Sequence, residues 1–427
     1  MRKFPPESTH PDIDLTQLAL TRAGYAPGII DGKFGPITRS ALERFRKDRN
    51  MEIFSDITKD DWRALMPFLV GYVTHTTKAG DTVHRLAEQF RTTVSAIETA
   101  NPDILRGAVA GGQRLRIPLD FPLVSGNIRF TSAALYYTLR GLTARYPQIG
   151  QKTIGRTVSG TEIPVLCFGS GPHSVSFNAA HHGNEWITTP ILLKFLEEYA
   201  RAHASGGNIA DLEAKLLYSA ATLHLIPMVN PDGVDIATGA LDQGPSYEYA
   251  TMLAENYPQI PFPCGFKANS RGVDLNLQYP AGWEKAREIK FSQGVTRPGP
   301  RDYVGKSPLS EPESRALYEY TLQNDFRLTL SYHSQGEIIY WRYLDHLPPN
   351  SLEIGKTFAR LSGYSLEETP YVSGHAGYKD WFISQYNRPG YTIEVGAGES
   401  PLPLSQFDKI YGDNLAMLAT ALVITAS

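Results

Sequence analysis

Cysteine is scarce in this sequence, and long apolar segments are absent. Cys167 and Cys264 are the only cysteines among 427 residues, which excludes a disulfide framework and a zinc site built from cysteines. The longest apolar segment, Leu415–Ala426, is too short to cross a bilayer, so we expect a terminal helix there and no membrane span. Residues Met1–His10 contain basic side chains but no apolar stretch, so no signal peptide is visible.

The sequence also has little net charge. Its 41 Lys and Arg residues nearly balance 44 Asp and Glu residues, the formal net charge is −3, and the basic residues do not cluster. Proteins that bind nucleic acid or anionic membranes usually concentrate positive charge on one face. We therefore expect neither among the partners of this protein.

The chain is too long for one typical domain, and its composition patterns divide it into three segments. We expect a small all-α module over residues 10–68 and a small β-α-α-β module over residues 72–119. A short linker, Asp120–Asn127, leads to a third segment over residues 128–427, which is large enough for a catalytic domain.

Both small segments carry specific motifs. Gly28–Phe45, GIIDGKFGPITRSALERF, resembles the peptidoglycan-binding domain; the alternative is a generic three-helix adaptor. Residues 72–119 contain GDTVHRLAEQF, ANP and GQRLRIP, and they resemble a LysM domain. This resemblance implies binding to glycans that contain N-acetylglucosamine. His84 stands where LysM domains often have an aromatic residue, a departure that bears on affinity more than on fold.

Short apolar runs alternate with helical patterns in the third segment. The strand-like runs include Ser174–Ala180, Leu328–Tyr332 and Tyr391–Val395, and the helical patterns include Thr188–Ala202 and Gln406–Ile424. Such alternation indicates an α/β fold with a mixed, mostly parallel sheet that is flanked by helices.

Polar side chains with metal-binding chemistry lie at the ends of those three strand-like runs. His182 and Glu185 follow the first run, His333 follows the second, and Glu394 lies near the end of the third. Open α/β sheets bind ligands at the carboxyl ends of their strands, so we expect these four side chains to meet at one edge. Two histidines and a glutamate form a zinc site with an open position for water, and a further glutamate can act as general base. The sequence therefore predicts one Zn²⁺ per chain.

Each of these residues also has a structural interpretation. A His-x-x-Glu pair arises easily by chance, His181 is an alternative to its neighbour His182, and His333 could be a hydrogen-bonded loop residue. We favour His182 because only this histidine has a glutamate three positions later. A buried Glu394 is costly without a partner, which would be either metal-bound water or an arginine.

The order of motifs in the third segment resembles the zinc carboxypeptidase family. HGNE is followed by NPDG, RGVDLN, YHSQG, a tyrosine with a glycine-rich loop, and IEVG, over almost all of Ile128–Ser427. The resemblance implies that Glu394 is the general base and acid. The zinc ligands that it implies are His182, Glu185 and His333.

The segment that would bind the substrate departs from this family. Carboxypeptidases carry an arginine directly after the Asn of the D-x-N element, and the pair binds the terminal carboxylate; here Asn276 is followed by Leu277. Removal of ordinary C-terminal amino acids is therefore not the expected activity. The polar side chains that remain as candidates for substrate binding are Asn276, Arg271, Lys267, Arg301 and Tyr371, the last with Tyr378 as its rival.

The altered element is similar to that of bacterial γ-D-glutamyl-L-diamino acid endopeptidases. This resemblance implies a zinc metallopeptidase that cuts the γ-D-glutamyl–meso-diaminopimelate bond of peptidoglycan, with the glycan and stem peptides of the cell wall as partners. The alternatives are a metallocarboxypeptidase of broader specificity and a catalytically inactive wall-binding protein. Without a visible signal peptide we expect either a cytoplasmic protein of a sporulating or recycling cell, or a mature form associated with the cell wall.

Overall fold

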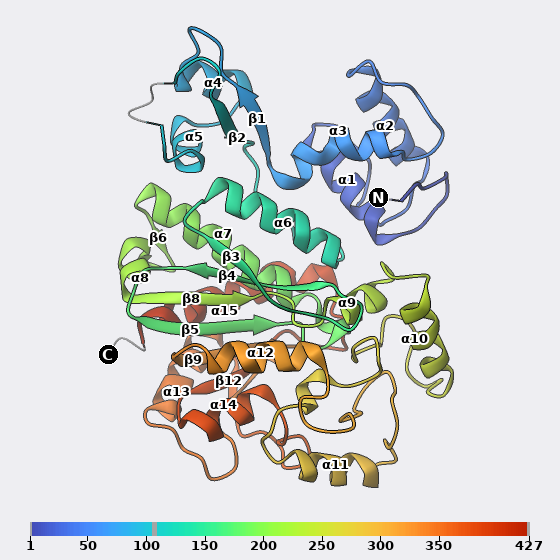
Figure 1. The fold of residues 1–427 in the computed structure, drawn as a ribbon, viewed down its shortest axis with the longest axis vertical. Helices are drawn as coiled ribbons and strands as arrows, with labels where there is room; N and C mark the ends of the chain where they lie inside the picture. The colour runs from blue at the N-terminus through green and yellow to red at the C-terminus, as the bar shows by residue number, and fades with distance from the viewer. Residues whose placement is uncertain (1, 105–108, 425–427) are drawn as a thin grey trace. The chain divides into compact units, whose positions relative to one another are not determined.

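The computed structural model describes residues 2–104 and 109–424, and it divides into two compact units. The first unit comprises residues 1–129 and 133–150, and the second comprises residues 130–132 and 151–427. Figure 1 shows the order of the helices and strands along the chain. No helix among the described residues is long and apolar enough to cross a membrane.

The first unit opens with three helices around a turn that is held by one buried side chain. These helices are α1 (Pro11–Arg22), α2 (Pro36–Lys47) and α3 (Lys59–Val70). The Gln17 side chain is buried; its oxygen accepts hydrogen bonds from the backbone N–H groups of Asp31 and Gly32, and its amide donates to Thr38 Oγ1. The conformation of the D-G-x-F-G turn therefore depends on polar contacts between α1, the turn and α2.

The same unit continues with the β-α-α-β segment and then a long helix. The elements are β1 (Tyr72–Thr76), α4 (Val83–Phe90), α5 (Val94–Ala100), β2 (Arg114–Pro118) and α6 (Ser132–Arg145). Strands β1 and β2 pair antiparallel. The side chain of Asn101 donates to the carbonyls of Ile97 and Arg116 and accepts from the Arg116 N–H, so it fastens the end of α5 to β2. Most of α6 belongs with this unit, although we expected residues from 128 onwards to belong to the third segment.

The second unit is built on an eight-stranded sheet with the strand order β11-β10-β12-β9-β5-β8-β4-β3. These strands are β3 (Gly150–Arg156), β4 (Glu162–Phe168), β5 (His173–Ala179), β8 (Ala221–Ile226), β9 (Phe326–His333), β10 (Ile338–Tyr340), β11 (Ser365–Glu367) and β12 (Gly390–Glu394). Strands β8, β5, β9 and β12 run parallel to one another, and β4 and β10 pair antiparallel to their neighbours β8 and β12. The expected mixed, mostly parallel sheet is confirmed.

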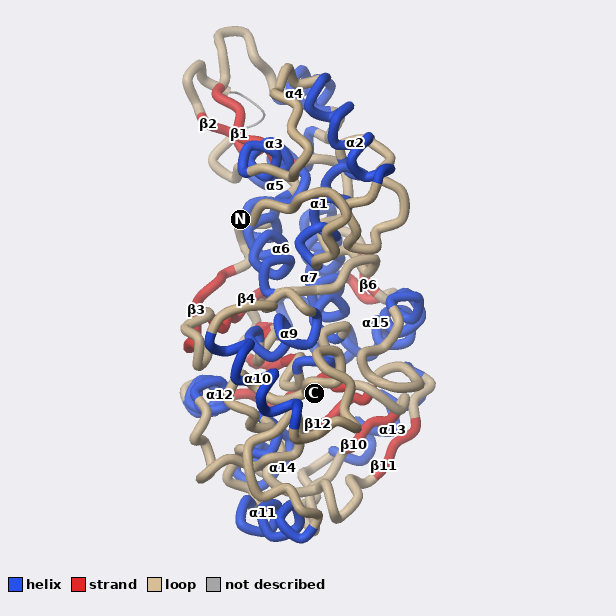
Figure 2. The backbone as a smooth tube through the Cα atoms, turned by 90° about the vertical axis from the view of Figure 1, so that its right-hand side faces the viewer, coloured by secondary structure: helices blue, strands red, loops and turns tan. Residues whose placement is uncertain are grey.

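Helices cover both faces of this sheet, as Figures 1 and 2 show. On β4, Val165 faces the core formed with α12 and α14, whereas Phe168 points to the other face and packs on Tyr199 of α7 at 4.8 Å between ring centroids. The helices of this unit are α7 (Thr188–Ser205), α8 (Ala214–Ala220), α9 (Pro231–Thr238), α10 (Pro245–Glu255), α11 (Trp283–Ser292), α12 (Pro312–Leu322), α13 (Ser351–Ser362), α14 (Tyr378–Tyr386) and α15 (Phe407–Val423). The remaining short elements are β6 (Asn208–Ile209), β7 (Leu212–Glu213) and the 3₁₀ turns η1 (Gly183–Glu185), η2 (Leu275–Leu277) and η3 (Leu404–Gln406).

Candidate active site

Three adjacent parallel strands bring the predicted site residues to one edge of the sheet. Strand β9 lies between β5 and β12, and its last residue, His333, is the register partner of Glu394 at the end of β12. His182 lies three residues after the end of β5, and the η1 turn that follows it carries Glu185. Four residues that are far apart in sequence therefore share one location because parallel strands end at the same edge.

Three of these side chains form a compact, buried group of metal-binding atoms. One ligand atom from each of His182, Glu185 and His333 lies within 4.8 Å of the others, and all three residues are buried. The Nδ1 atoms of the two histidines are 3.2 Å apart, and each is 2.9 Å from an oxygen of Glu185. Two imidazole nitrogens that face each other across a carboxylate fit a divalent cation, and this donor set is typical of zinc with an open fourth position.

The carboxylate of Asp274 orients His182, one of the three residues of the metal-binding group. Asp274 Oδ1 lies 3.0 Å from His182 Nε2, on the side of the ring opposite to Glu185. Burial opposes ionisation of Asp274, but the charges of His182 and Lys267 hold the pKa of this carboxyl well below its usual value. The carboxylate therefore holds the Nε2 proton of His182 and leaves Nδ1 directed at the metal position.

His181, the alternative to His182, points elsewhere. Its ring is fully buried, its Nε2 lies 3.0 Å from the Tyr279 hydroxyl, and the ring stacks on His333 with 5.5 Å between centroids. Burial, together with the nearby histidines, lowers the pKa of His181 well below its usual value, so this ring is neutral. It contributes packing behind His333 and not an atom of the metal-binding group.

Glu394 has the environment expected of a general base. Burial and the negative charge of Glu185 together raise the pKa of Glu394 to about 8, although the charges of Lys267 and His182 oppose the shift. Among the described residues, the charged groups that act on Glu394 are Glu185, Lys267 and His182, and none of them is an arginine. Glu394 is half-buried at the end of β12, and a carboxyl with a pKa near neutrality can both accept and return a proton.

Lys267 adds a positive charge that sequence patterns alone do not locate securely. The Nζ atom of Lys267 lies 2.9 Å from Glu185 Oε1. The backbone carbonyl of Lys267 accepts a hydrogen bond from the Gly183 N–H. Burial opposes its charge, but the Glu185 and Asp274 carboxylates raise the pKa of Lys267. The ammonium group therefore remains charged beside the metal-binding group.

The other predicted substrate-binding residues occupy different environments. Asn276 Oδ1 accepts the backbone N–H of Tyr378, whose own ring is fully buried with its hydroxyl 2.9 Å from Thr321 Oγ1. Tyr371, in contrast, is 58 % exposed, so it is the tyrosine of the pair whose hydroxyl is available to a substrate. Arg271 and Arg301 are exposed side chains, and they pair with Glu311 at 3.8 Å and with Asp302 at 2.9 Å respectively.

Leu277 is buried among apolar side chains. It packs in a cluster with Trp283, Ala286, Val304 and Ala376. A charged side chain at this position would lose its hydration in that environment, so the apolar residue is part of the local packing.

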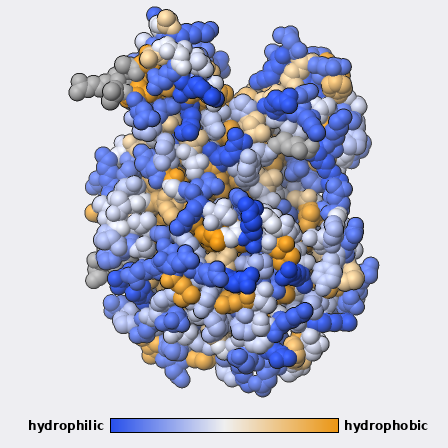
Figure 3. Space-filling view, viewed as in Figure 1, coloured by the Kyte–Doolittle hydropathy of each residue, from blue (hydrophilic) through white to orange (hydrophobic). Residues whose placement is uncertain are grey.

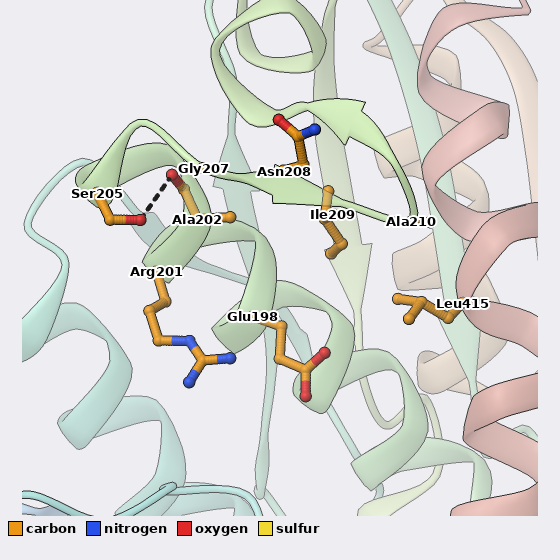
Figure 4. Close-up of a pocket in the computed structure, with 9 residues that line it drawn as sticks. All are labelled: Glu198, Arg201, Ala202, Ser205, Gly207, Asn208, Ile209, Ala210 and Leu415. Atoms are coloured by element: carbon orange, nitrogen blue, oxygen red, sulfur yellow. Dashed lines mark hydrogen bonds between the residues drawn. The ribbon is translucent and has the colours of Figure 1, made fainter.

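A separate cavity of about 470 Å³ lies away from this group of residues. Its lining comes from the end of α7, the β6–β7 segment and Leu415 of α15, and Figure 4 shows the side chains of Glu198, Arg201 and Asn208 around it. None of the candidate site residues lines this cavity.

Three protein-family models match separate segments of the chain. The chain matches the family model described as zinc carboxypeptidase over residues 135–417, the putative peptidoglycan-binding domain over residues 9–53, and the LysM domain over residues 75–118. The resemblances inferred from the sequence motifs are confirmed.

Two bacterial proteins are similar over most of the chain. The chain is 38 % identical over 309 residues to γ-D-glutamyl-L-diamino acid endopeptidase 1 of Lysinibacillus sphaericus, which covers 72 % of this chain and 75 % of that protein. It is 37 % identical over 297 residues to the uncharacterized protein YqgT of Bacillus subtilis (strain 168), with 69 % of this chain and 77 % of that protein covered.

Solved structures share the fold. Bovine thrombin-activatable fibrinolysis inhibitor, in complex with tick carboxypeptidase inhibitor, superposes with a TM-score of 0.53 at 19 % identity, over 69 % of this chain and 96 % of that chain. Carboxypeptidase A from Helicoverpa armigera gives 0.51 at 18 % identity, over 92 % of this chain and 87 % of that chain. These similarities confirm the expected carboxypeptidase-like α/β fold.

Proposed function

Because the chain belongs to the zinc carboxypeptidase family, we propose that it is a zinc peptidase that hydrolyses the γ-D-glutamyl–meso-diaminopimelate bond of peptidoglycan stem peptides. The observation that carries the chemistry is the buried group of three metal-binding side chains at the sheet edge, with Glu394 at the end of the neighbouring strand. The observation that carries the substrate is the similarity, over most of both chains, to a protein named for this type of bond.

The side chains have distinct roles in this proposal. His182, Glu185 and His333 hold the zinc, which when bound supplies a Lewis acid for the scissile carbonyl and acidifies its water. Glu394 takes a proton from the attacking water and passes it to the leaving amine. The ammonium group of Lys267 stabilises the negative charge that develops on the carbonyl oxygen.

Two features of the chain support a cell-wall substrate. The matches to a peptidoglycan-binding domain and a LysM domain indicate binding to peptidoglycan. We assign binding to residues 10–68 and 72–119 and catalysis to residues 128–427, and we infer that the protein works in association with the wall. Tethering through these modules raises the effective concentration of the catalytic unit on an insoluble polymer.

The residue at position 277 supports an endopeptidase over an ordinary carboxypeptidase. Leu277 carries no charge and is buried in an apolar cluster, so it offers no hydrogen bond to a terminal carboxylate. Each hydrogen bond to a charged group is worth about 1.5–3 kcal/mol, and its absence weakens the binding of a simple C-terminal residue. Asn276, Arg271 and Tyr371 remain the proposed contacts to the rest of the substrate.

The test compares two substrates of the purified, zinc-loaded protein. We expect L-Ala-γ-D-Glu-meso-diaminopimelate to be cut after D-Glu with a kcat/KM far above that for a blocked dipeptide carboxypeptidase substrate, as measured by mass spectrometry of the products. The Glu394→Gln variant, which is nearly isosteric but cannot shuttle a proton, is expected to keep its zinc and lose about 10²–10⁴-fold in rate. Equal kcat/KM values on the two substrates would support the broader carboxypeptidase, and no cleavage of either would support an inactive wall-binding protein.

A further inference from the structure

The cavity of about 470 Å³ at the end of α7 has no part in the proposed chemistry. Helix α7 begins at Thr188, three residues after Glu185, and its last turns, from Glu198 to Ser205, line the cavity. An α-helix rises about 1.5 Å per residue, so this lining lies roughly 15–25 Å along the helix from the metal-binding group. A ligand in the cavity is therefore separate from the bond that is cleaved.

Two opposite charges on α7 line the cavity without pairing with each other. Glu198 and Arg201 are three positions apart, which places them on the same face of the helix. Among the described residues, the guanidinium group of Arg201 forms no ion pair and no hydrogen bond. Figure 4 shows both charged groups extending from α7 in the same direction. A guanidinium group is always charged and has several N–H donors, so that of Arg201 is available to an anion in the cavity.

The carboxylate of Glu198 is oriented by a tyrosine of α15, which leaves one of its oxygens without a hydrogen bond. The Tyr411 hydroxyl donates to Glu198 Oε2 at 2.6 Å. Burial and the charge of Glu198 raise the pKa of Tyr411, so this hydroxyl stays protonated and keeps its bond. The other oxygen, Oε1, lies 4.0 Å from Lys194 Nζ, which is beyond hydrogen-bond distance. Glu198 Oε1 can therefore accept a hydrogen bond from a cationic group of a ligand.

The other walls of the cavity supply aliphatic contacts and one amide. The aliphatic side chains are those of Ala202, Ile209 and Leu415, and Asn208 adds an amide that can both donate and accept a hydrogen bond. Ala210, in the two-residue turn between β6 and β7, has a left-handed φ of 47°. Such turns usually place glycine or asparagine there, and residues held in unfavourable conformations concentrate in ligand-binding segments. The backbone of this wall therefore also has a feature of a binding site.

We propose that this cavity binds a short zwitterionic peptide, with the carboxylate of the peptide on Arg201 and its ammonium group on Glu198. Two neighbouring charges of opposite sign that do not pair with each other complement a ligand that carries both signs. The aliphatic walls favour small apolar side chains on that ligand. Pockets for small-molecule ligands measure roughly 300–1,000 Å³, so the cavity is large enough for a dipeptide. The inference goes beyond the proposed function and does not depend on it, because no residue of the metal-binding group takes part.

The experiment measures the Kd of D-alanyl-D-alanine for the full chain by isothermal titration calorimetry. This dipeptide is zwitterionic, has two small apolar side chains and lacks the bond that the proposed peptidase cleaves. N-acetyl-D-alanyl-D-alanine has no ammonium group and D-alanyl-D-alaninamide has no carboxylate, and we expect each to bind at least about 10-fold more weakly. Arg201→Gln should weaken binding of the dipeptide about 10–100-fold and abolish its advantage over the amide. Glu198→Gln should abolish its advantage over the acetylated analogue.

An exposed arginine on another helix provides the matched control. Arg315 lies on α12 and does not line the cavity, so Arg315→Gln should bind the dipeptide as the wild-type protein does. No binding by the wild-type protein, an unchanged Kd in Arg201→Gln, or an equal loss in Arg315→Gln would overturn the proposal. Turnover of L-Ala-γ-D-Glu-meso-diaminopimelate is measured separately and should be unchanged in both cavity variants. Failure of the wild-type protein to cut that peptide would overturn the proposed function and leave the binding result standing.

Discussion

At the scale of single residues, the metal-binding role of His333 can be tested against a neighbouring histidine. His333→Ala removes one of the three proposed zinc ligands. Loss of a residue that only hydrogen-bonds to a ligand typically lowers metal affinity roughly 10–100-fold, so we expect a larger fall in zinc affinity here. Peptidase activity should fall with it. The measurement is zinc content by elemental analysis after dialysis against a weak chelator.

His181 is a suitable control because it is equally buried and packs on His333. Its Nε2 points to the Tyr279 hydroxyl and not to the metal-binding group, so His181→Phe should retain zinc. Full zinc occupancy in His333→Ala would show that the ligand set is wrong, and loss of zinc only in His181→Phe would exchange the roles of the two residues.

The residues that sequence patterns reveal are those at the ends of recognisable strands. His182, His333 and Glu394 each follow or end an apolar run, so their meeting point follows from how parallel strands are arranged. Asp274 and Lys267 lie in irregular segments, and their contacts with His182 and Glu185 depend on loop conformation. No local pattern encodes such contacts, so the sequence offered Lys267 as one of several basic candidates.

At the scale of secondary-structure elements, Glu313 couples the start of α12 to neighbouring loops. This buried carboxyl accepts hydrogen bonds from the Val158 N–H at 3.0 Å and from Asn269 Nδ2 at 3.3 Å. Burial nevertheless raises the pKa of Glu313 to about 7. The carboxyl therefore ionises in the unfolded chain at a lower pH than in the folded protein.

This difference predicts a pH-dependent stability. The pKa of Glu313 is higher in the folded protein than in the unfolded chain. Its contribution to the free energy of unfolding is therefore greatest below about pH 4.5 and is lost as pH rises through about 7. Glu313→Gln removes the titration, so its stability relative to the wild type should improve between pH 5 and pH 8, by up to roughly 3 kcal/mol at about 1.4 kcal/mol per pKa unit. Urea unfolding followed by tryptophan fluorescence measures the free energy of unfolding at both pH values.

An exposed carboxylate on the same helix serves as the control. Glu319→Gln should change the free energy of unfolding by the same small amount at both pH values. If the difference between Glu313→Gln and the wild type does not change with pH, the carboxyl at position 313 is ionised throughout this range.

Helices and strands with a regular spacing of apolar residues can be predicted from the sequence. Irregular segments that lack this spacing cannot. The helix expected over Thr188–Ala202 is observed as α7, and the strands expected before His182 and His333 are observed as β5 and β9. The sheet order could not be predicted, because it depends on which distant strands pair. Helices α10 and α11 were also missed, since they lie in a glycine- and proline-rich stretch whose conformation is fixed by long-range packing.

At the scale of the whole molecule, the chain combines a catalytic unit with segments that match two small binding modules. On the face shown in Figure 3, apolar residues are scattered among hydrophilic ones. The modules contain none of the proposed zinc ligands, nor Glu394. Their contribution should therefore depend on whether the substrate is part of the insoluble wall.

This dependence gives the last prediction. A chain that starts at residue 128 should cut a soluble tripeptide with nearly unchanged kcat/KM, because every proposed catalytic residue is retained. On insoluble peptidoglycan the truncated chain should be slower than the full chain. We expect a difference of about 10²-fold if both modules of the full chain bind the polymer together with the catalytic unit. The measurement is release of stem-peptide fragments from sacculi, compared with turnover of the tripeptide at equal protein concentration.

The structure indicates how to separate loss of binding from damage to the fold. The Arg145 side chain of α6 donates to the carbonyls of Gly71 and Leu119, so truncation leaves part of this helix without its partners. A second variant, Ile97→Asp, keeps the full chain and places a charge in the fully buried core of the β-α-α-β module. Both variants should lose rate on sacculi and keep it on the tripeptide, because only binding to the polymer is impaired. Equal losses on the two substrates in Ile97→Asp would mean that this module supports the catalytic unit and does not tether it.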